Sequence, residues 1–162
     1  MTELTNLEMK LGEVIGLAMA AQAATERVEK LTTDAKLRKQ LKTMRQEAAK
    51  AEKDGTAVAA SLNGKKSKIL AEARAVKTKG ATMMKTYLER GSDELDGFEF
   101  LTMAEAGEVG HWGVLQELNK QARHPGVRDL VKVQLPIQKR HLKDVMAASL
   151  QLAAKEDANA AA

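Results

Sequence analysis

The sequence predicts an all-α fold, an antiparallel four-helix bundle with an extra connecting helix between the second and third core helices. Along most of the 162 residues, apolar side chains recur at alternating steps of three and four, which is the period of one helix face. Aromatic residues make up only 2% of the chain, so the core must be built from aliphatic residues, methionine and alanine, which favours helices over strands. Only two prolines, Pro125 and Pro136, could break a helix.

The first half of the chain predicts two long helices. One apolar stripe runs over residues 4–31, and a second runs over residues 37–62. Thr32, Thr33 and Asp34 lie between the stripes and offer N-cap side chains to the second helix. Asn63 and Gly64 are typical of a helix end. Because long helices joined by a short turn pack against each other in opposite directions, these two form an antiparallel hairpin.

The second half predicts three more helices. Residues 65–90 form a connecting helix that is basic on its outer face and interrupted by Gly80. Ser92 and the acidic residues after it indicate the start of a helix over residues 93–122. After a turn at 123–126 the last helix reaches about residue 152, with a bend expected at Pro136. We expect one domain over residues 1–155 and an Ala-rich polar tail over 156–162.

Composition excludes several classes of site. The chain has no cysteine, which excludes disulfides, iron–sulfur clusters, thiolate zinc sites and cysteine nucleophiles. Gly107, Gly110 and Gly113 lie at steps of three inside a predicted helix, so they indicate close helix packing rather than a phosphate-binding loop. The first ten residues contain no apolar signal segment, and no stretch approaches the roughly 18 uninterrupted apolar residues of a membrane span. We therefore expect a cytoplasmic protein that binds no membrane.

One set of polar residues interrupts the apolar stripes of the last two helices. Glu105 and Glu108 occupy positions that continue the series Leu101, Trp112 and Leu115, so both carboxylates are predicted to point inward. His111 follows Glu108 by three residues, and Gln138 and His141 repeat that spacing on the last helix. This is the spacing at which a helix presents two ligands to one ion.

The turn between these two helices predicts which residues lie at the same height. If the turn is centred between His124 and Pro125, Glu108 lies level with His141, His111 with Gln138, and Glu105 with Asp144. Two interpretations follow. The polar side chains could hold a divalent ion such as Fe, Mn or Zn, or they could form a hydrogen-bonded polar layer without metal, with Glu108 paired to His141 and Glu105 to a lysine or arginine.

Two segments resemble the ferritin-like superfamily, and among its members the YciF-type stress-associated bacterial proteins. Residues 104–115, AEAGEVGHWGVL, resemble the stretch of that family's third core helix in which two Glu are followed by an aromatic residue, Gly and Leu. Residues 135–142, LPIQKRHL, are similar to the Glu-x-x-His of the last ferritin helix, with Gln138 in place of Glu. The resemblance implies metal binding between the helices, with ligands from all four core helices.

The first two helices depart from the ferritin pattern. At the corresponding level their stripes contain Ala18, Ala21, Met44 and Ala48, and only Gln22 and Glu47 lie at the margins. Gln138 further lowers the charge of the ligand set, because a neutral amide replaces a carboxylate. The sequence therefore predicts a degenerate site with one ion or none, built from Glu105, Glu108, His111, Gln138 and His141.

We expect a ferritin-like bundle with a partial, mononuclear transition-metal site and a stress-related role. The alternative is a non-enzymatic helical interaction or stress-response module without metal. No catalytic residue can be named, and the sequence leaves open whether the protein is an enzyme. A homodimer is expected, because bundles of this kind pair through exposed apolar stripes. The net charge of +4 and the lysines at 65, 66 and 68 are typical of a solvated surface, so nucleic acid is not expected as a partner.

Overall fold

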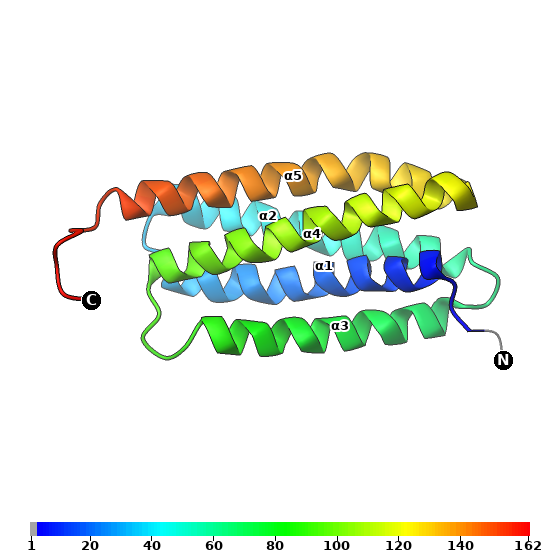
Figure 1. Cartoon of the computed structure of the whole chain (residues 1–162), viewed down its shortest axis with the longest axis horizontal. Helices are drawn as coiled ribbons and strands as arrows, with labels where there is room; N and C mark the ends of the chain where they lie inside the picture. Colours follow the sequence, from blue (N-terminus) through cyan, green and yellow to red (C-terminus); the bar gives the residue numbers. More distant parts are fainter. Residues whose placement is uncertain (1–2) are drawn as a thin grey trace.

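The computed structural model describes residues 3–162, which fold into five α-helices without a strand (Figure 1). They are α1 (Asn6–Leu31), α2 (Ala35–Ala60), α3 (Lys66–Tyr87), α4 (Glu94–Ala122) and α5 (Pro125–Ala153). The prediction of an all-helical bundle is confirmed, and each observed helix lies within a few residues of a predicted one. The expected domain began at Met1, but Met1 and Thr2 lie outside the described residues. None of the helices in residues 3–162 is long and apolar enough to cross a membrane.

Short polar side chains determine where the helices begin. Thr5 and Glu8 form a reciprocal capping box at the start of α1, and Asp34 accepts a hydrogen bond from the Leu37 amide at 2.9 Å to cap α2. Asp93 caps α4, one residue after the predicted Ser92. Each cap satisfies a backbone amide that the first helical turn would otherwise leave unpaired.

The α4–α5 turn is shorter than predicted. Arg123 adopts a left-handed conformation with φ 54°, and the Asn119 side chain exchanges two hydrogen bonds with the backbone of His124. The His124 ring then accepts from the Val127 amide at 3.2 Å, which caps α5. Pro125, expected in the turn, is instead the first residue of α5, a position where its missing amide hydrogen costs nothing.

The helices pack in a defined order. Consecutive helices run in opposite directions (Figure 1). α1 packs on α2, α3 and α4, while α5 packs on α4 and α2. α3 lies mainly against α1 and touches α4 only slightly. This leaves one side of α3 free of other helices.

Glycine allows α3 to approach α1 closely. A Cβ atom on Gly16 would lie 2.4 Å from the carbonyl oxygen of Ala73, and one on Gly12 would lie 2.8 Å from that of Ile69. Both distances are shorter than any side chain tolerates, so the close contact requires glycine at these positions. α3 is one continuous helix through Gly80, which the sequence analysis expected to interrupt it.

The apolar core consists of two clusters, one toward each end of the bundle. The Trp112 cluster includes Leu11, Ile15, Ile69, Leu115 and Val131, and the Phe98 cluster includes Val28, Leu41, Leu101 and Val145. Along α4, Glu105 and Glu108 lie between Leu101 of one cluster and Trp112 of the other. The two buried carboxyl groups of α4 therefore lie near mid-height of the bundle, between two apolar regions.

Candidate functional site

The structure buries four of the five residues predicted to form a site. Glu105 and Glu108 lie on the inner face of α4 and are 1% and 4% exposed, and Gln138 and His141 lie on the inner face of α5. The helical period explains this placement, because all four continue the apolar stripe of their helix. With Glu47 of α2, described below, we call this group the polar layer.

Glu105 is the acceptor that joins α4 to α5. The Gln138 amide donates a hydrogen bond to Oε2 of Glu105, and Nδ1 of His141 lies 3.6 Å from the same oxygen. The predicted levels were different, with Glu108 level with His141 and Glu105 level with Asp144, and the metal-free interpretation paired Glu105 with a lysine or arginine. Because α4 ends at Ala122 and α5 begins at Pro125, the turn is centred one residue earlier than assumed, which brings His141 nearer to the height of Glu105.

Glu47 of α2 completes the surroundings of His141. Its Oε1 atom lies 3.5 Å from Nε2 of His141, and its other carboxylate oxygen pairs with the guanidinium of Arg140. The sequence placed Glu47 at the margin of its stripe, and Glu47 was not among the predicted site residues. The sequence feature that could have indicated this contact is the position of Glu47 between Met44 and Ala48, at the edge of the buried stripe of α2.

Two buried atoms face each other there without a hydrogen bond. Oε1 of Glu47 and Nε2 of His141 are both shielded from solvent, and neither has a hydrogen-bond partner. An ionised carboxylate and the lone pair of a neutral imidazole repel each other at this distance. The contact is satisfied when Nε2 carries a hydrogen, which a neutral or a charged ring can supply, or when a metal ion lies between the two atoms.

Glu108 has no polar partner. Among residues 3–162 no hydrogen bond or ion pair reaches its carboxyl group, although the group is buried. Burial raises the pKa of Glu108 well above its ordinary value, and the negative charge of Glu105 raises this pKa further. Glu108 therefore binds a proton more tightly than a solvent-exposed glutamate does.

His111 faces away from the other predicted site residues. Its side chain is 42% exposed, and its Nδ1 atom lies 3.1 Å from both Nζ of Lys10 and Oε2 of Glu13 on α1. Among the described residues, it makes no hydrogen bond or ion pair with Glu105, Gln138 or His141. It shares with Glu105 and Glu108 only the lining of a cavity between α1, α3 and α4.

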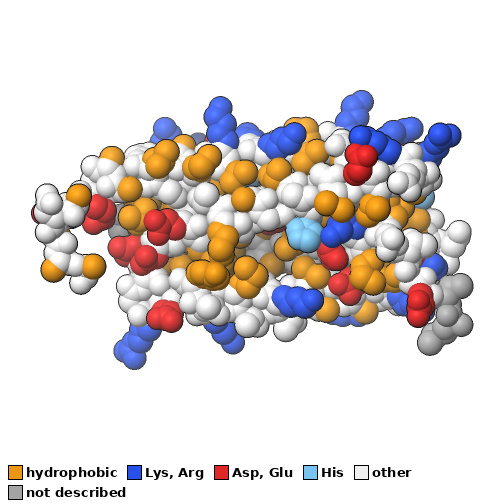
Figure 2. All heavy atoms as spheres, viewed as in Figure 1, with side chains coloured by type: hydrophobic (Ala, Val, Ile, Leu, Met, Phe, Trp, Pro, Cys, Tyr) orange, Lys and Arg blue, Asp and Glu red, His pale blue; other side chains and the backbone are white. Residues whose placement is uncertain are grey.

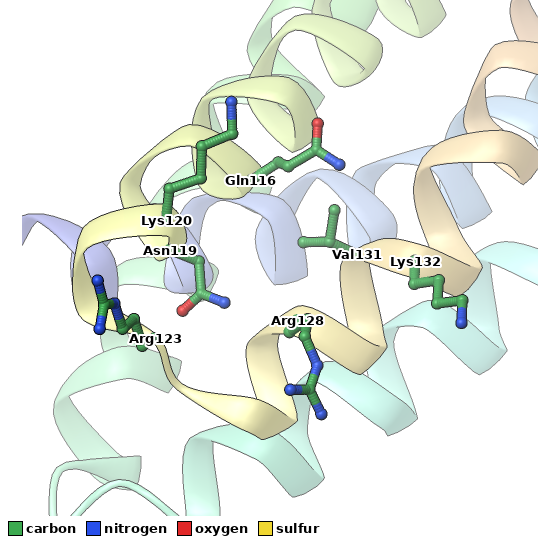
Figure 3. Close-up of a pocket in the computed structure, with 7 residues that line it drawn as sticks. All are labelled: Gln116, Asn119, Lys120, Arg123, Arg128, Val131 and Lys132. Carbon is green, nitrogen blue, oxygen red and sulfur yellow. The ribbon is translucent and has the colours of Figure 1, made fainter.

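A second concavity lies beside the α4–α5 turn and encloses about 680 Å³. Its lining includes Lys120, Arg123, Arg128 and Lys132. Figure 3 shows that the charged ends of these side chains point away from one another rather than toward a common centre. Arg128 and Lys120 are also paired with the neighbouring acids Asp129 and Glu117. This arrangement does not form an anion site, because converging donors are needed to hold a phosphate.

The polar layer offers few side chains that could bind a metal ion together. In the part of the chain that the structure describes, no three His, Asp or Glu side chains are grouped so that they could hold a metal ion. Two side chains, Glu47 and His141, direct a possible metal-binding atom toward the same point. Glu105 lies on the other side of the His141 ring.

Comparisons with protein-family models, curated proteins and solved structures give no match to this chain. The resemblance to ferritin-like proteins therefore depends on the residues of this sequence alone.

Proposed function

We propose that this protein is a ferritin-like helical bundle that binds a single divalent transition-metal ion, Fe, Mn or Zn, between α2 and α5. The packing of α1 on α2 and α4, and of α5 on α2 and α4, supports a four-helix core with α3 added on the outside of α1. The sequence resemblance to ferritin-like proteins predicted this order of helices. The stress-related role belongs to the same proposal, because it follows from the resemblance only.

The facing pair of unbonded atoms on Glu47 and His141 carries the proposal. The two atoms lie 3.5 Å apart. An imidazole nitrogen and a carboxylate oxygen are ligands that Fe, Mn and Zn accept, so Glu47 and His141 would hold the ion between them. Glu105 lies near the opposite ring nitrogen, where a carboxylate that accepts the Nδ1 hydrogen would leave the Nε2 lone pair free for the ion.

Because the protein supplies only two metal ligands, Glu47 and His141, the proposed site would bind an ion weakly and leave part of its coordination shell open. Arg140 neutralises part of the Glu47 charge, which lowers the attraction for a cation further. An iron ion held with open positions would supply redox chemistry with dioxygen or peroxide. The site differs from the predicted set, because His141 is the one predicted ligand that it keeps. Glu47 is added, Glu105 orients the ring rather than binding the ion, and Glu108, His111 and Gln138 are not ligands.

The alternative function is a helical interaction module without metal. In that case a hydrogen on Nε2 of His141 takes the place of the ion and is donated to Glu47, while Glu105 lies near the other ring nitrogen. The two alternatives differ in one measurable respect. A metal that binds only the folded chain raises its melting temperature, whereas a proton-stabilised layer does not respond to metal.

Thermal unfolding with and without Mn²⁺, Zn²⁺ or anaerobic Fe²⁺ tests the proposal. At a metal concentration one hundred times Kd we expect a stabilisation of about 2.7 kcal/mol, which raises Tm by about 5–10 °C for a chain of this length. Glu47→Gln and His141→Ala should abolish the shift. Glu52→Gln is the matched control, because Glu52 also lies on α2 but pairs with Gln22 instead. A wild-type Tm that none of the three metals changes would exclude the metal site and favour the metal-free module.

A further inference from the structure

A cavity separate from the Glu47–His141 pair opens on the face between α3 and α4. It encloses about 190 Å³ and lies between α1, α3 and α4. Leu17 and Ala20 of α1, Met83 of α3, and Phe100 and Met103 of α4 supply its apolar wall. Figure 2 shows that apolar side chains gather in the band between α4 and α3. Met83 and Met103 are 46% and 37% exposed, so the cavity reaches the surface there.

Glu108 gives this apolar cavity one buried polar group. Its carboxyl lines the cavity and is 4% exposed, and no other described residue bonds to it. A buried polar group without a partner is costly. The cavity supplies the space in which a partner for Glu108 could lie.

The charged residues around the cavity determine whether a cationic or an anionic ligand would be favoured there. Glu105 and Glu108 both belong to its lining, and the only other ionisable lining residue, His111, is already held by Lys10 and Glu13. An anionic ligand would lie beside the negative charge of Glu105 in a poorly solvated space, which is unfavourable. An ammonium ion beside Glu108 would favour the ionised form of that carboxyl and pair with it, without removing any bond that the protein makes.

The volume and the wall define the rest of the ligand. A dry apolar cavity of about 150 Å³ is large enough for benzene, so 190 Å³ accommodates one aromatic ring or a short alkyl chain. We infer that this cavity binds a small organic amine, with its ammonium group at the Glu108 carboxyl and its apolar part against Leu17, Met83 and Phe100. The inference does not depend on metal binding, because Glu47 and His141 are not part of the cavity.

The backbone of α4 leaves the entrance open. Gly107 lines the cavity, and a Cβ atom placed on it would meet nothing within 4 Å. A glycine inside a long helix costs about 1 kcal/mol relative to alanine, and no close helix contact explains it at this position. A larger residue at 107 would extend into the space that a ligand enters.

Calorimetric titration with benzylamine, benzyl alcohol and benzoate tests the inference. These probes share one ring and differ in the charge of the polar group. With chelator present, so that metal plays no part, we expect benzylamine to bind one to one and roughly tenfold more tightly than benzyl alcohol, and benzoate not to bind. Equal affinities for benzylamine and benzyl alcohol, or no binding of benzylamine at millimolar concentration, would overturn the inference.

Two pairs of variants locate the binding. Glu108→Gln should reduce benzylamine affinity by roughly tenfold and leave benzyl alcohol unchanged; an unchanged benzylamine affinity would contradict the role of Glu108. Gly107→Leu should abolish binding of both probes. Gly110→Leu is its control, because position 110 is equally open but does not line the cavity. If Glu108→Gln fails to fold, the glycine pair and the three probes still decide the question.

Discussion

Glu108 combines a buried carboxyl group with a second carboxylate nearby, and this has a consequence for stability. Its pKa is raised in the folded chain, by burial first and by Glu105 second, whereas the unfolded chain titrates near the ordinary value of about 4.3. The folded state therefore binds this proton more tightly. The stabilisation is fully present below the unfolded pKa and is lost as the pH rises through the folded pKa.

Replacing Glu108 with glutamine removes the part of the stability that depends on its protonation. The free energy of unfolding of Glu108→Gln, relative to wild type, should increase as the pH rises above about 4.3, by about 1.4 kcal/mol for each unit by which folding raises the pKa. Urea unfolding in chelator between about pH 4 and pH 8 measures it. Glu117→Gln is the control, because Glu117 lies on the same helix with its side chain 71% exposed. A difference between Glu108→Gln and wild type that does not change with pH would show that Glu108 ionises normally.

At the scale of the helices, glycine has two different roles. Gly16 of α1 lies against α3, where an added Cβ would be 2.4 Å from the Ala73 carbonyl oxygen and 2.7 Å from Cβ of Val76. The same addition at Gly110 of α4 meets nothing within 4 Å. The prediction that Gly107, Gly110 and Gly113 permit close helix packing is therefore wrong, whereas Gly12 and Gly16 of α1 do permit it.

Alanine at these two positions should have opposite effects. Gly16→Ala must push α3 from α1 and should destabilise the protein by about 1–3 kcal/mol. Gly110→Ala should stabilise it by about 0.5–1 kcal/mol, because alanine favours the helix and has room there. Urea denaturation measures both changes. If Gly16→Ala were as stable as wild type, the α1–α3 contact would have to be looser than the structure indicates.

The helices could be predicted from the sequence because their signals are local. Caps such as Asp34 and the apolar period lie within each segment. Contacts between helices could not be predicted to the same accuracy, since they depend on the turn geometry. A turn centred one residue earlier changed the partner of His141 from Glu108 to Glu105, and Glu47, at the edge of its stripe, became a neighbour only after α2 and α5 had packed.

At the scale of the whole molecule, the polar layer lies between the Trp112 and Phe98 clusters without belonging to either. A bundle stabilised by two apolar clusters does not need charged groups at its centre. Burying them costs desolvation, and a buried ionic network replaced by apolar residues of similar volume often leaves a protein equally stable or about 1–4 kcal/mol more stable. The layer is therefore better explained by a ligand than by folding.

The combined replacement Glu105→Leu, Glu108→Leu, Gln138→Leu and His141→Leu tests this explanation. We expect a variant that is as stable as metal-free wild type, or more stable by up to about 4 kcal/mol, and that has lost both the metal-dependent Tm shift and benzylamine binding. Gln138→Leu alone should instead destabilise by about 1–3 kcal/mol, because it removes the hydrogen bond to Glu105 and leaves that carboxylate buried without its donor. Chemical denaturation of both variants in chelator gives the comparison. A combined variant less stable than Gln138→Leu would mean that the polar layer holds the two clusters in register, and its role would then be structural.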